Sequence, residues 1–292
     1  MSHRRSVLWP DRRVKPPYGS VEIDWGHPLA QGLRVLTLPA GVPPYDLARR
    51  LPPSSNNTAK TSTFSRGAET YSDMGGVRIA WADPTSDYSD TEGAFYCRFV
   101  ATAVGNGSLE ILHKIGGGNQ SVAAVARLVI SNGSNVWGPR FYLGSYVDGF
   151  DSISIVFNTI PNNPACLYGP SAICVTWDAS YLYAYLQPGV GSAVVAPTAV
   201  SRTKTIAATG EYDLTVGAAT TATAGTTGFG ISMFSRWSRT LTRADFTWLN
   251  ADPYCFLRPI IRRSYGFVGA AAGGWKPAWA VRPSRTIGTG VI

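Results

Sequence analysis

The fold of this chain is decided by residues 228–259, which read GFGISMFSRWSRTLTRADFTWLNADPYCFLRP. Apolar and polar residues alternate from 228 to 237, and such alternation predicts a strand with one buried face. Ile231 and Met233 are expected on one face of that strand, and Phe234 and Arg236 on the other.

A short capped helix is expected directly after this strand. Thr242 is a good N-cap, and Asp245 three residues later completes a capping box. Leu241 before the cap and Phe246 after it can form a hydrophobic staple. Asp252-Pro253 stops the helix, because a proline disfavours helical geometry in the residue before it. One short helix at the end of a strand-rich chain indicates a mostly β domain.

The composition supports the same fold class. Charged residues make up 15% of the 292 residues, and the chain holds 31 glycines and 20 prolines, which is typical of a turn-rich all-β protein. Residues 34–75 are expected to be irregular, and short strands follow at regular spacing, which predicts a sandwich or barrel. The expected strands are 76–81, 93–102, 108–115, 121–131, 139–146, 152–158, 171–177, 180–187, 204–208, 211–218 and 228–237.

The clearest hairpin spans residues 171–187. Its second strand carries Tyr181, Tyr183 and Tyr185 on one face. Such a row is expected to serve the core or an interface, although an exposed row would suit stacking on sugars. Its first strand places Ala172, Cys174 and Thr176 on one face and Ile173, Val175 and Trp177 on the other.

Four segments together resemble a known family. They are the closing stretch 228–259, residues 23–33 (IDWGHPLAQGL) with Tyr45-Asp46-Leu47, the hairpin 173–185, and residues 212–217 (YDLTVG). They resemble the concanavalin A-like, or laminin-G-like, jelly-roll domain as it occurs in virion proteins of tailed bacteriophages. The resemblance covers residues 21–259. It implies an all-β, antiparallel jelly-roll sandwich with one short C-terminal helix and extended arms at both ends.

Charge is segregated along the chain. Of the formal net charge of +8, residues 1–20 carry +4, residues 256–292 carry +6 and residues 21–255 carry −2. We therefore expect a basic N-terminal arm and entering segment over 1–30, a jelly-roll domain over 31–255 and a basic, aromatic, Pro/Gly-rich arm over 256–292. The side chains expected to dock on a partner are Arg4, Arg5, Trp9, Arg12, Arg13, Arg262, Arg263, Trp275 and Trp279.

Three roles are open for these arms. They can dock on an acidic protein surface, neutralise nucleic-acid phosphates, or remain solvated tails. Proline and tryptophan between the basic residues favour shaped protein contacts over nucleic acid.

The resemblance implies a structural virion protein, made in the cytoplasm of a bacterial host and carried in the particle. Its expected partners are capsid or tail proteins, with self-association or a place in a lattice. Capsid decoration or head-fibre attachment is the first hypothesis, a lectin-like tail component that binds a receptor or glycan is the second, and a glycan hydrolase is the third. No apolar run is long enough to span a bilayer, so no membrane partner is expected.

No catalytic residue is assigned. Residues 22–27 (EIDWGH) are similar to the Glu-x-Asp-x-x-Glu strand of jelly-roll glucanases, but His27 stands where the third carboxylate would be. A retaining glycosidase needs two carboxyl groups at close range. Glu22 and Asp24 are therefore expected to be structural.

One loop is a candidate metal site. Asp83, Asp87 and Asp90 lie in the oxygen-rich run DPTSDYSD, which could bind calcium. Ordinary loop chemistry accounts for the same residues and is favoured, so neither a metal nor any other cofactor is expected. Cys97 and Cys174 lie in apolar strand patterns and are expected to be buried thiols.

Overall fold

The computed structural model describes the chain in segments between Val21 and Ile260. The chain divides into two compact units, residues 1–259 and 260–292. Apart from Ile260, the described residues all belong to the first unit. The described segments are 21–38, 45–52, 55–56, 63–66, 69–73, 78–83, 91–101, 108–115, 124–131, 139–145, 149–155, 169–189, 192–204, 212–217 and 229–260.

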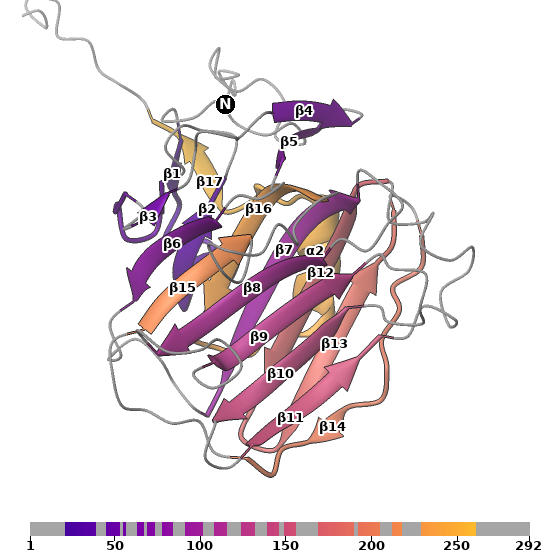
Figure 1. Cartoon of the computed structure of the whole chain (residues 1–292). Coiled ribbons are helices and arrows are strands. Elements are labelled where there is room, and N and C mark those ends of the chain that lie inside the picture. Colours follow the sequence, from indigo (N-terminus) through magenta and orange to yellow (C-terminus); the bar gives the residue numbers. More distant parts are fainter. Residues whose placement is uncertain are drawn as a thin grey trace, which may run out of the picture. The chain divides into compact units, whose positions relative to one another are not determined.

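A seven-stranded sheet forms one layer of the fold (Figure 1). Its strands all pair antiparallel. In spatial order they are β11 (Gly149–Ser154), β10 (Arg140–Ser145), β9 (Ala124–Ser131), β8 (Ser108–Ile115), β15 (Tyr212–Gly217), β6 (Arg78–Asp83) and β3 (Ser55–Asn56). Strand β15 lies between β8 and β6, so a late part of the chain returns to the middle of the sheet.

An eight-stranded antiparallel sheet forms the second layer. In spatial order its strands are β14 (Val200–Ser201), β13 (Tyr181–Gln187), β12 (Ser171–Trp177), β7 (Gly93–Ala101), β16 (Phe229–Trp237), β5 (Glu69–Asp73) and β4 (Thr63–Arg66). The eighth strand, β2 (Leu33–Thr37), pairs with β16 beside β5. The predicted all-β sandwich with a short helix near the C-terminal end is confirmed.

The expectation that residues 34–75 are irregular was wrong. Strands β2 to β5 lie in or overlap this range. They are short, and β3 itself lies within the Ser-Ser-Asn-Asn run of residues 54–57, which shows no alternation. Strands β2 and β5 pair with β16 and β3 pairs with β6, so pairing with other parts of the chain fixes these three strands where local pattern does not. Strand β4 pairs with its neighbour β5.

The main hydrophobic core lies between the two sheets. It draws on β7, β12, β13 and β16 from one layer and on β9, β10, β11 and β15 from the other. Phe141 of β10 stacks on Trp177 of β12 with ring centroids 5.6 Å apart. Phe95 of β7 meets these two rings edge-on at 6.0 and 5.7 Å. This three-ring cluster joins the layers across the core, with the offset and edge geometries that aromatic pairs prefer.

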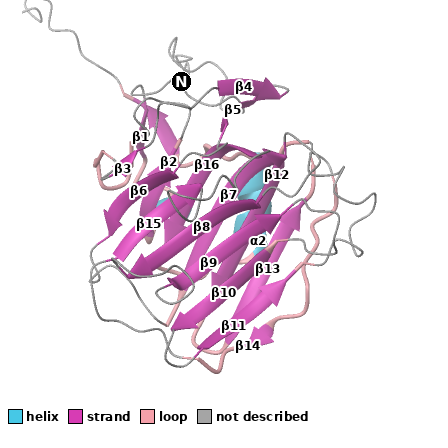
Figure 2. Cartoon of the chain, viewed as in Figure 1, coloured by secondary structure: helices cyan, strands magenta, loops and turns pink. Residues whose placement is uncertain are grey.

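A further layer covers the outer face of the eight-stranded sheet. It contains helix α2 (Arg243–Ala251), the one-turn 3-10 helix η1 (Pro28–Ala30), and a two-stranded sheet of β1 (Val21–Ile23) and β17 (Leu257–Pro259). Figure 2 shows α2 behind the strands of that sheet.

This covering layer creates a second core. Tyr96, Cys174 and Met233 project from the eight-stranded sheet and are buried with Phe246 and Leu249 of α2. Both faces of the central strands are therefore covered, which explains why all of β12 and β16 is buried, including the polar side chain of Arg236. The predicted division of the hairpin faces is confirmed, since Ile173, Val175 and Trp177 enter the main core and Ala172 and Cys174 the second.

The two ends of the described chain meet in this layer. Strand β1 pairs antiparallel with β17, with Val21 opposite Pro259 and Ile23 opposite Leu257. Val21, Ile23 and Leu257 are buried in the second core. The described residues 21–30 and 256–259 thus pack with the domain, and the arm assignments of the other terminal residues stay a prediction.

The predicted assignment of the side chains of β16 to its two faces was partly wrong. Phe229 and Ile231 face the main core, whereas Met233 faces the second core. The register against β7 shifts between Ile231 and Met233, so Ser232 is the extra residue of a β-bulge. The bulge inverts the alternation, which a strict two-residue period cannot anticipate.

The capped helix is confirmed. The Thr242 side chain accepts a hydrogen bond from the Asp245 backbone N–H (3.1 Å), and the Asp245 carboxylate accepts one from the Thr242 N–H (2.9 Å). Leu241 and Phe246, the predicted staple pair, are both fully buried in the second core. The helix ends at Ala251, with Asp252 as its C-cap.

The predicted burial of the thiols is confirmed. Cys97 and Cys174 are free and lie fully inside the two cores. Burial raises the pKa of both thiols far above the ordinary value. Neither is therefore a thiolate at neutral pH, and both act as small apolar side chains.

Candidate binding site

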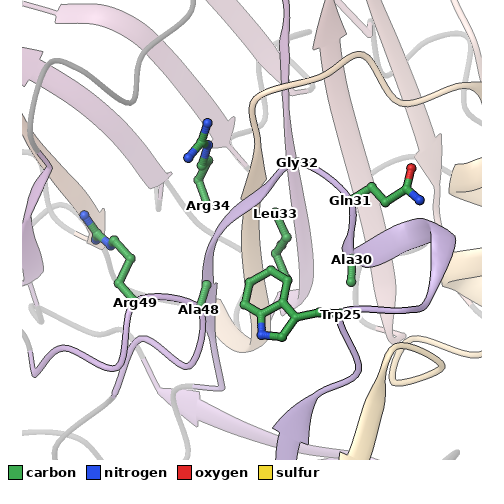
Figure 3. Close-up of a pocket in the computed structure, with 8 residues that line it drawn as sticks. All are labelled: Trp25, Ala30, Gln31, Gly32, Leu33, Arg34, Ala48 and Arg49. Atoms are coloured by element: carbon green, nitrogen blue, oxygen red, sulfur yellow. The ribbon is translucent and has the colours of Figure 1, made fainter.

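A pocket of about 420 Å³ lies at the N-terminal segment of the domain. It combines an exposed indole with two guanidinium groups. Figure 3 shows the indole of Trp25 near Leu33 and Ala48, with the two arginine side chains extending on one flank. The lining residues are Trp25, Ala30, Gln31, Gly32, Leu33, Arg34, Ala48 and Arg49.

Trp25 is carried on a tight turn directly after β1. The Asp24 carbonyl accepts a hydrogen bond from the His27 N–H (2.9 Å), and the Asp24 carboxylate accepts one from the Gly26 N–H (3.2 Å). The Asp24 N–H donates to the Phe256 carbonyl (2.9 Å), which ties the turn to the segment before β17. The indole nevertheless remains 53% exposed. A large apolar ring held on a fixed turn and left in water is available to a ligand.

Arg49 is positioned by a buried carboxylate. Asp46 is fully buried, and its Oδ1 accepts hydrogen bonds from the Leu36 and Ala48 N–H groups, both at 3.0 Å. Its other oxygen, Oδ2, accepts from Arg49 Nε at 2.5 Å. Backbone therefore holds the carboxylate, and the carboxylate holds the guanidinium, which orients Arg49 at the pocket before any ligand arrives.

Arg34 comes from β2 and is exposed. Its Nε donates to the Ser238 hydroxyl at 3.1 Å, and the Ser238 N–H donates to the Gly32 carbonyl at 2.8 Å. The strand pairing between β2 and β16 thus places the arginine on the pocket rim. Among the described lining residues, two carry guanidinium groups and none carries a carboxylate. This lining suits a ring that stacks on an indole and carries negative charge.

Glu22 and Asp24 both lie near Arg258, and their structural role stays a prediction. Arg258 Nε donates to Glu22 at 2.9 Å, and Arg258 Nη1 lies 3.9 Å from Asp24. These pairs tie β1 to β17. His27 caps η1, because its Nδ1 accepts from the Leu29 N–H at 3.2 Å.

The tyrosine row divides into a packed end and an exposed end. Tyr185 stacks on Phe246 of α2 with centroids 5.8 Å apart, so it belongs to the second core. Tyr183 donates to Asp178 at 3.0 Å, and Tyr181 is 43% exposed beside it. The predicted core role is confirmed for Tyr185, and Tyr181 presents a ring to solvent.

Asp178 closes the turn of this hairpin. Its Oδ1 accepts from the Ser180 and Tyr181 N–H groups, both at 2.7 Å. Partial burial acts to raise the pKa of Asp178, but these hydrogen bonds and the one from Tyr183 outweigh it, so the pKa is lowered. The carboxylate is therefore a turn element.

The arm residues predicted to dock on a partner all lie outside the described residues. The calcium candidates Asp87 and Asp90 lie outside them too, while Asp83 is described by its backbone alone, as the last residue of β6. Within the described segments, no three His, Cys, Asp or Glu side chains could hold a metal ion, and no helix is long and apolar enough to cross a membrane.

The sequence did not predict the pocket. Trp25 stands within the glucanase-like run, and Arg34 and Arg49 belong to a range expected to be irregular. Three basic or aromatic residues spread over positions 25–49 form no motif. The one available signal was the run of residues 45–50, YDLARR, in which Asp46 and Arg49 have the spacing of an ion pair within one turn.

No protein-family model matches the chain, and no curated protein sequence is similar to it. The receptor-binding domain of botulinum neurotoxin C/D mosaic serotype is 9% identical with a TM-score of 0.53, over 76% of this chain and 51% of that one. The ligand-binding domain of botulinum neurotoxin serotype D, in complex with N-acetylneuraminic acid, is 8% identical with a TM-score of 0.52, over 75% and 50%.

A Trypanosoma rangeli sialidase is 12% identical with a TM-score of 0.48, over 77% of this chain and 33% of that one. The chain spans about half the length of the neurotoxin domains. The likeness to those domains shows a shared all-β fold.

Proposed function

We propose that this protein is a non-enzymatic structural component of a tailed-phage virion, and that it docks on the particle through its two terminal arms. The observation that carries the proposal is the pairing of β1 with β17, in which Val21 lies opposite Pro259. The two terminal segments leave the folded body from paired residues. Both terminal segments therefore begin at the same place on the domain.

Charge strengthens this arrangement. Residues 1–20 carry a net charge of +4, and residues 260–292 hold five basic residues and no acidic one. Together the two segments carry a net charge of +9, while residues 21–259 are near neutral. Basic groups of this kind suit an acidic protein surface, and tryptophans among them can supply buried anchors. Capsid decoration or head-fibre attachment is the role proposed.

The test is incorporation into particles. Chains that lack residues 1–20 or 260–292 are expected to fold, as measured by circular dichroism, but to be lost from purified virions, as measured by immunoblot. Trp248→Ala is the control, because Trp248 is exposed on the body and lies outside the arms. Deletion of both arms with incorporation unchanged would overturn the proposal. Arm-dependent retention on phage DNA, with no binding to DNA-free particles, would instead assign the arms to nucleic acid.

A second candidate function is carbohydrate binding by the domain. The observation that favours it is the Trp25 pocket, since an exposed indole is a platform for a sugar ring. A domain of the same fold, that of botulinum neurotoxin serotype D, has been solved in complex with N-acetylneuraminic acid. A particle-bound protein of this kind would be a lectin-like component.

A glycan array tests this candidate. The full chain is expected to bind a defined subset of glycans, and Trp25→Ala is expected to remove that binding. Tyr181→Ala should leave it unchanged, because Tyr181 is a 43% exposed ring on the hairpin of β12 and β13, outside the pocket. An array with no signal above background, or equal loss in both variants, counts against carbohydrate binding at this pocket.

A further inference from the structure

We infer that the Trp25 pocket binds a saccharide that carries a carboxylate, with a sugar ring stacked on the indole and the carboxylate held by Arg34 and Arg49. The inference rests on carbohydrate binding as the second candidate function and names the ligand class of that site. Three features of the pocket carry it: an aromatic platform, the sign of its charges and its size.

The turn that carries the Trp25 indole is held in place before a ligand binds. The turn that carries Trp25 is closed by hydrogen bonds from the His27 and Gly26 N–H groups to Asp24, and it is tied to Phe256 through the Asp24 N–H. The backbone that carries the ring therefore loses little freedom when a ligand binds. Sugar rings present C–H faces that pack on aromatic rings, whereas a flexible peptide would have to order many bonds to use the same surface.

Guanidinium groups in the lining can bind an anion. Arg34 and Arg49 are the ionisable residues among the described lining residues, and Arg49 is ion-paired with Asp46. The carboxylate nearest to Arg49 in sequence, Asp46, is fully buried, and its two oxygens accept from Leu36, Ala48 and Arg49. Asp46 thus fixes the guanidinium and does not line the pocket. Planar guanidinium groups match the geometry of a carboxylate, which a neutral sugar lacks.

The size agrees with a short saccharide. A volume of about 420 Å³ falls in the lower part of the range of small-molecule sites, roughly 300–1,000 Å³. The walls other than the arginines are small or uncharged: Ala30, Gln31, Gly32, Leu33 and Ala48. They leave room beside the indole for one or two rings.

The test compares a charged saccharide with its neutral methyl ester. Tri-galacturonic acid and its fully methyl-esterified form are titrated into the full chain by isothermal titration calorimetry. The acid is expected to bind at least tenfold tighter than the ester, and its affinity is expected to fall with added salt. Equal affinity for both would overturn the inference.

Single-residue variants test whether the probes bind at the Trp25 pocket. Trp25→Ala is expected to weaken binding of both probes at least tenfold, and Arg34→Gln to weaken binding of the acid alone. The matched controls are Tyr181→Ala and Arg243→Gln, which change an exposed aromatic residue and an exposed arginine outside the pocket. Equal losses in the controls, or no measurable binding of the acid to the unmodified chain, would also overturn the inference.

The same variants distinguish an error in the acidic ligand class from an error in carbohydrate binding itself. If Trp25→Ala weakens binding of the ester as much as binding of the acid while Arg34→Gln changes neither, carbohydrate binding stands and the acidic ligand class is wrong. If the glycan array itself shows only neutral glycans that depend on Trp25, the same conclusion follows.

Discussion

Gly93 lies at the start of β7, opposite Trp177 of β12. A methyl group at this position would lie 2.3–2.8 Å from three ring atoms of Trp177. That ring is buried and packed on Phe95 and Phe141, so it has no free space to move into.

We therefore expect Gly93→Ala to lower the free energy of unfolding by about 1–3 kcal/mol, the usual cost of overpacking a core. The measurement is chemical denaturation of the purified chain. Gly26→Ala is the control, because the added methyl would meet only Asp24 Oδ1 at 3.4 Å on the surface. Gly93→Ala with unchanged stability would show that the indole can shift.

At the level of single residues, the sequence was informative where chemistry is local. Thr242 and Asp245 cap a helix through neighbours three positions apart, and both roles were predictable. Trp25 and Arg49 were not predictable as a pair, because residues far along the chain bring them together. Asp24 is tied to Phe256, and β2 is placed by β16. Their shared pocket is a product of tertiary structure.

At the level of elements, helix α2 matters because it supplies the cover of the second core. Phe246 and Leu249 are its buried residues, and Phe246 packs on Tyr96 and Tyr185. The amount of apolar surface that the helix buries depends on its first turn, which the capping box closes.

Thr242→Ala is expected to lower the free energy of unfolding by about 1 kcal/mol, because the Asp245 N–H loses its acceptor. Thr247→Ala is the comparison, since Thr247 is an exposed threonine within the same helix whose hydroxyl donates to the Arg243 carbonyl. Thermal unfolding of the two variants should separate them by a few degrees. Equal melting temperatures would mean that tertiary packing alone fixes the helix.

Strands β12 and β16 differ in how well the two-residue alternation of the sequence predicts which way their side chains face. In β12 the side chains follow the alternation that the sequence predicts, and each face enters its own core. In β16 the bulge at Ser232 inverts the alternation. The local pattern around Ser232 is the same in a regular strand and in a bulged one, so only the register against β7 distinguishes them.

At the level of the whole molecule, β1 closes the fold from the other end of the chain. Val21 and Ile23 are 3% and 4% exposed. Burying side chains of this kind is worth about 1.5–3 kcal/mol each. The strand also provides β17 with its only partner among the described strands.

Two truncations test this closure. A chain without residues 1–20 is expected to unfold at the same temperature as the full chain. A chain without residues 1–24 should lose several kcal/mol of stability, since it loses two buried side chains and the pairing with Leu257. Differential scanning calorimetry gives both values. Comparable melting of the two truncated chains would show that β1 adds nothing to the fold.

The antiparallel pairing of β1 and β17 also has a mechanical meaning. If a particle holds both arms, solvent drag on the body is transmitted through Val21 and Pro259, which lie opposite each other. Both strands are then pulled in the same direction, and the tension is shared between two backbones. The load then falls on a pairing that is only three residues long on each strand.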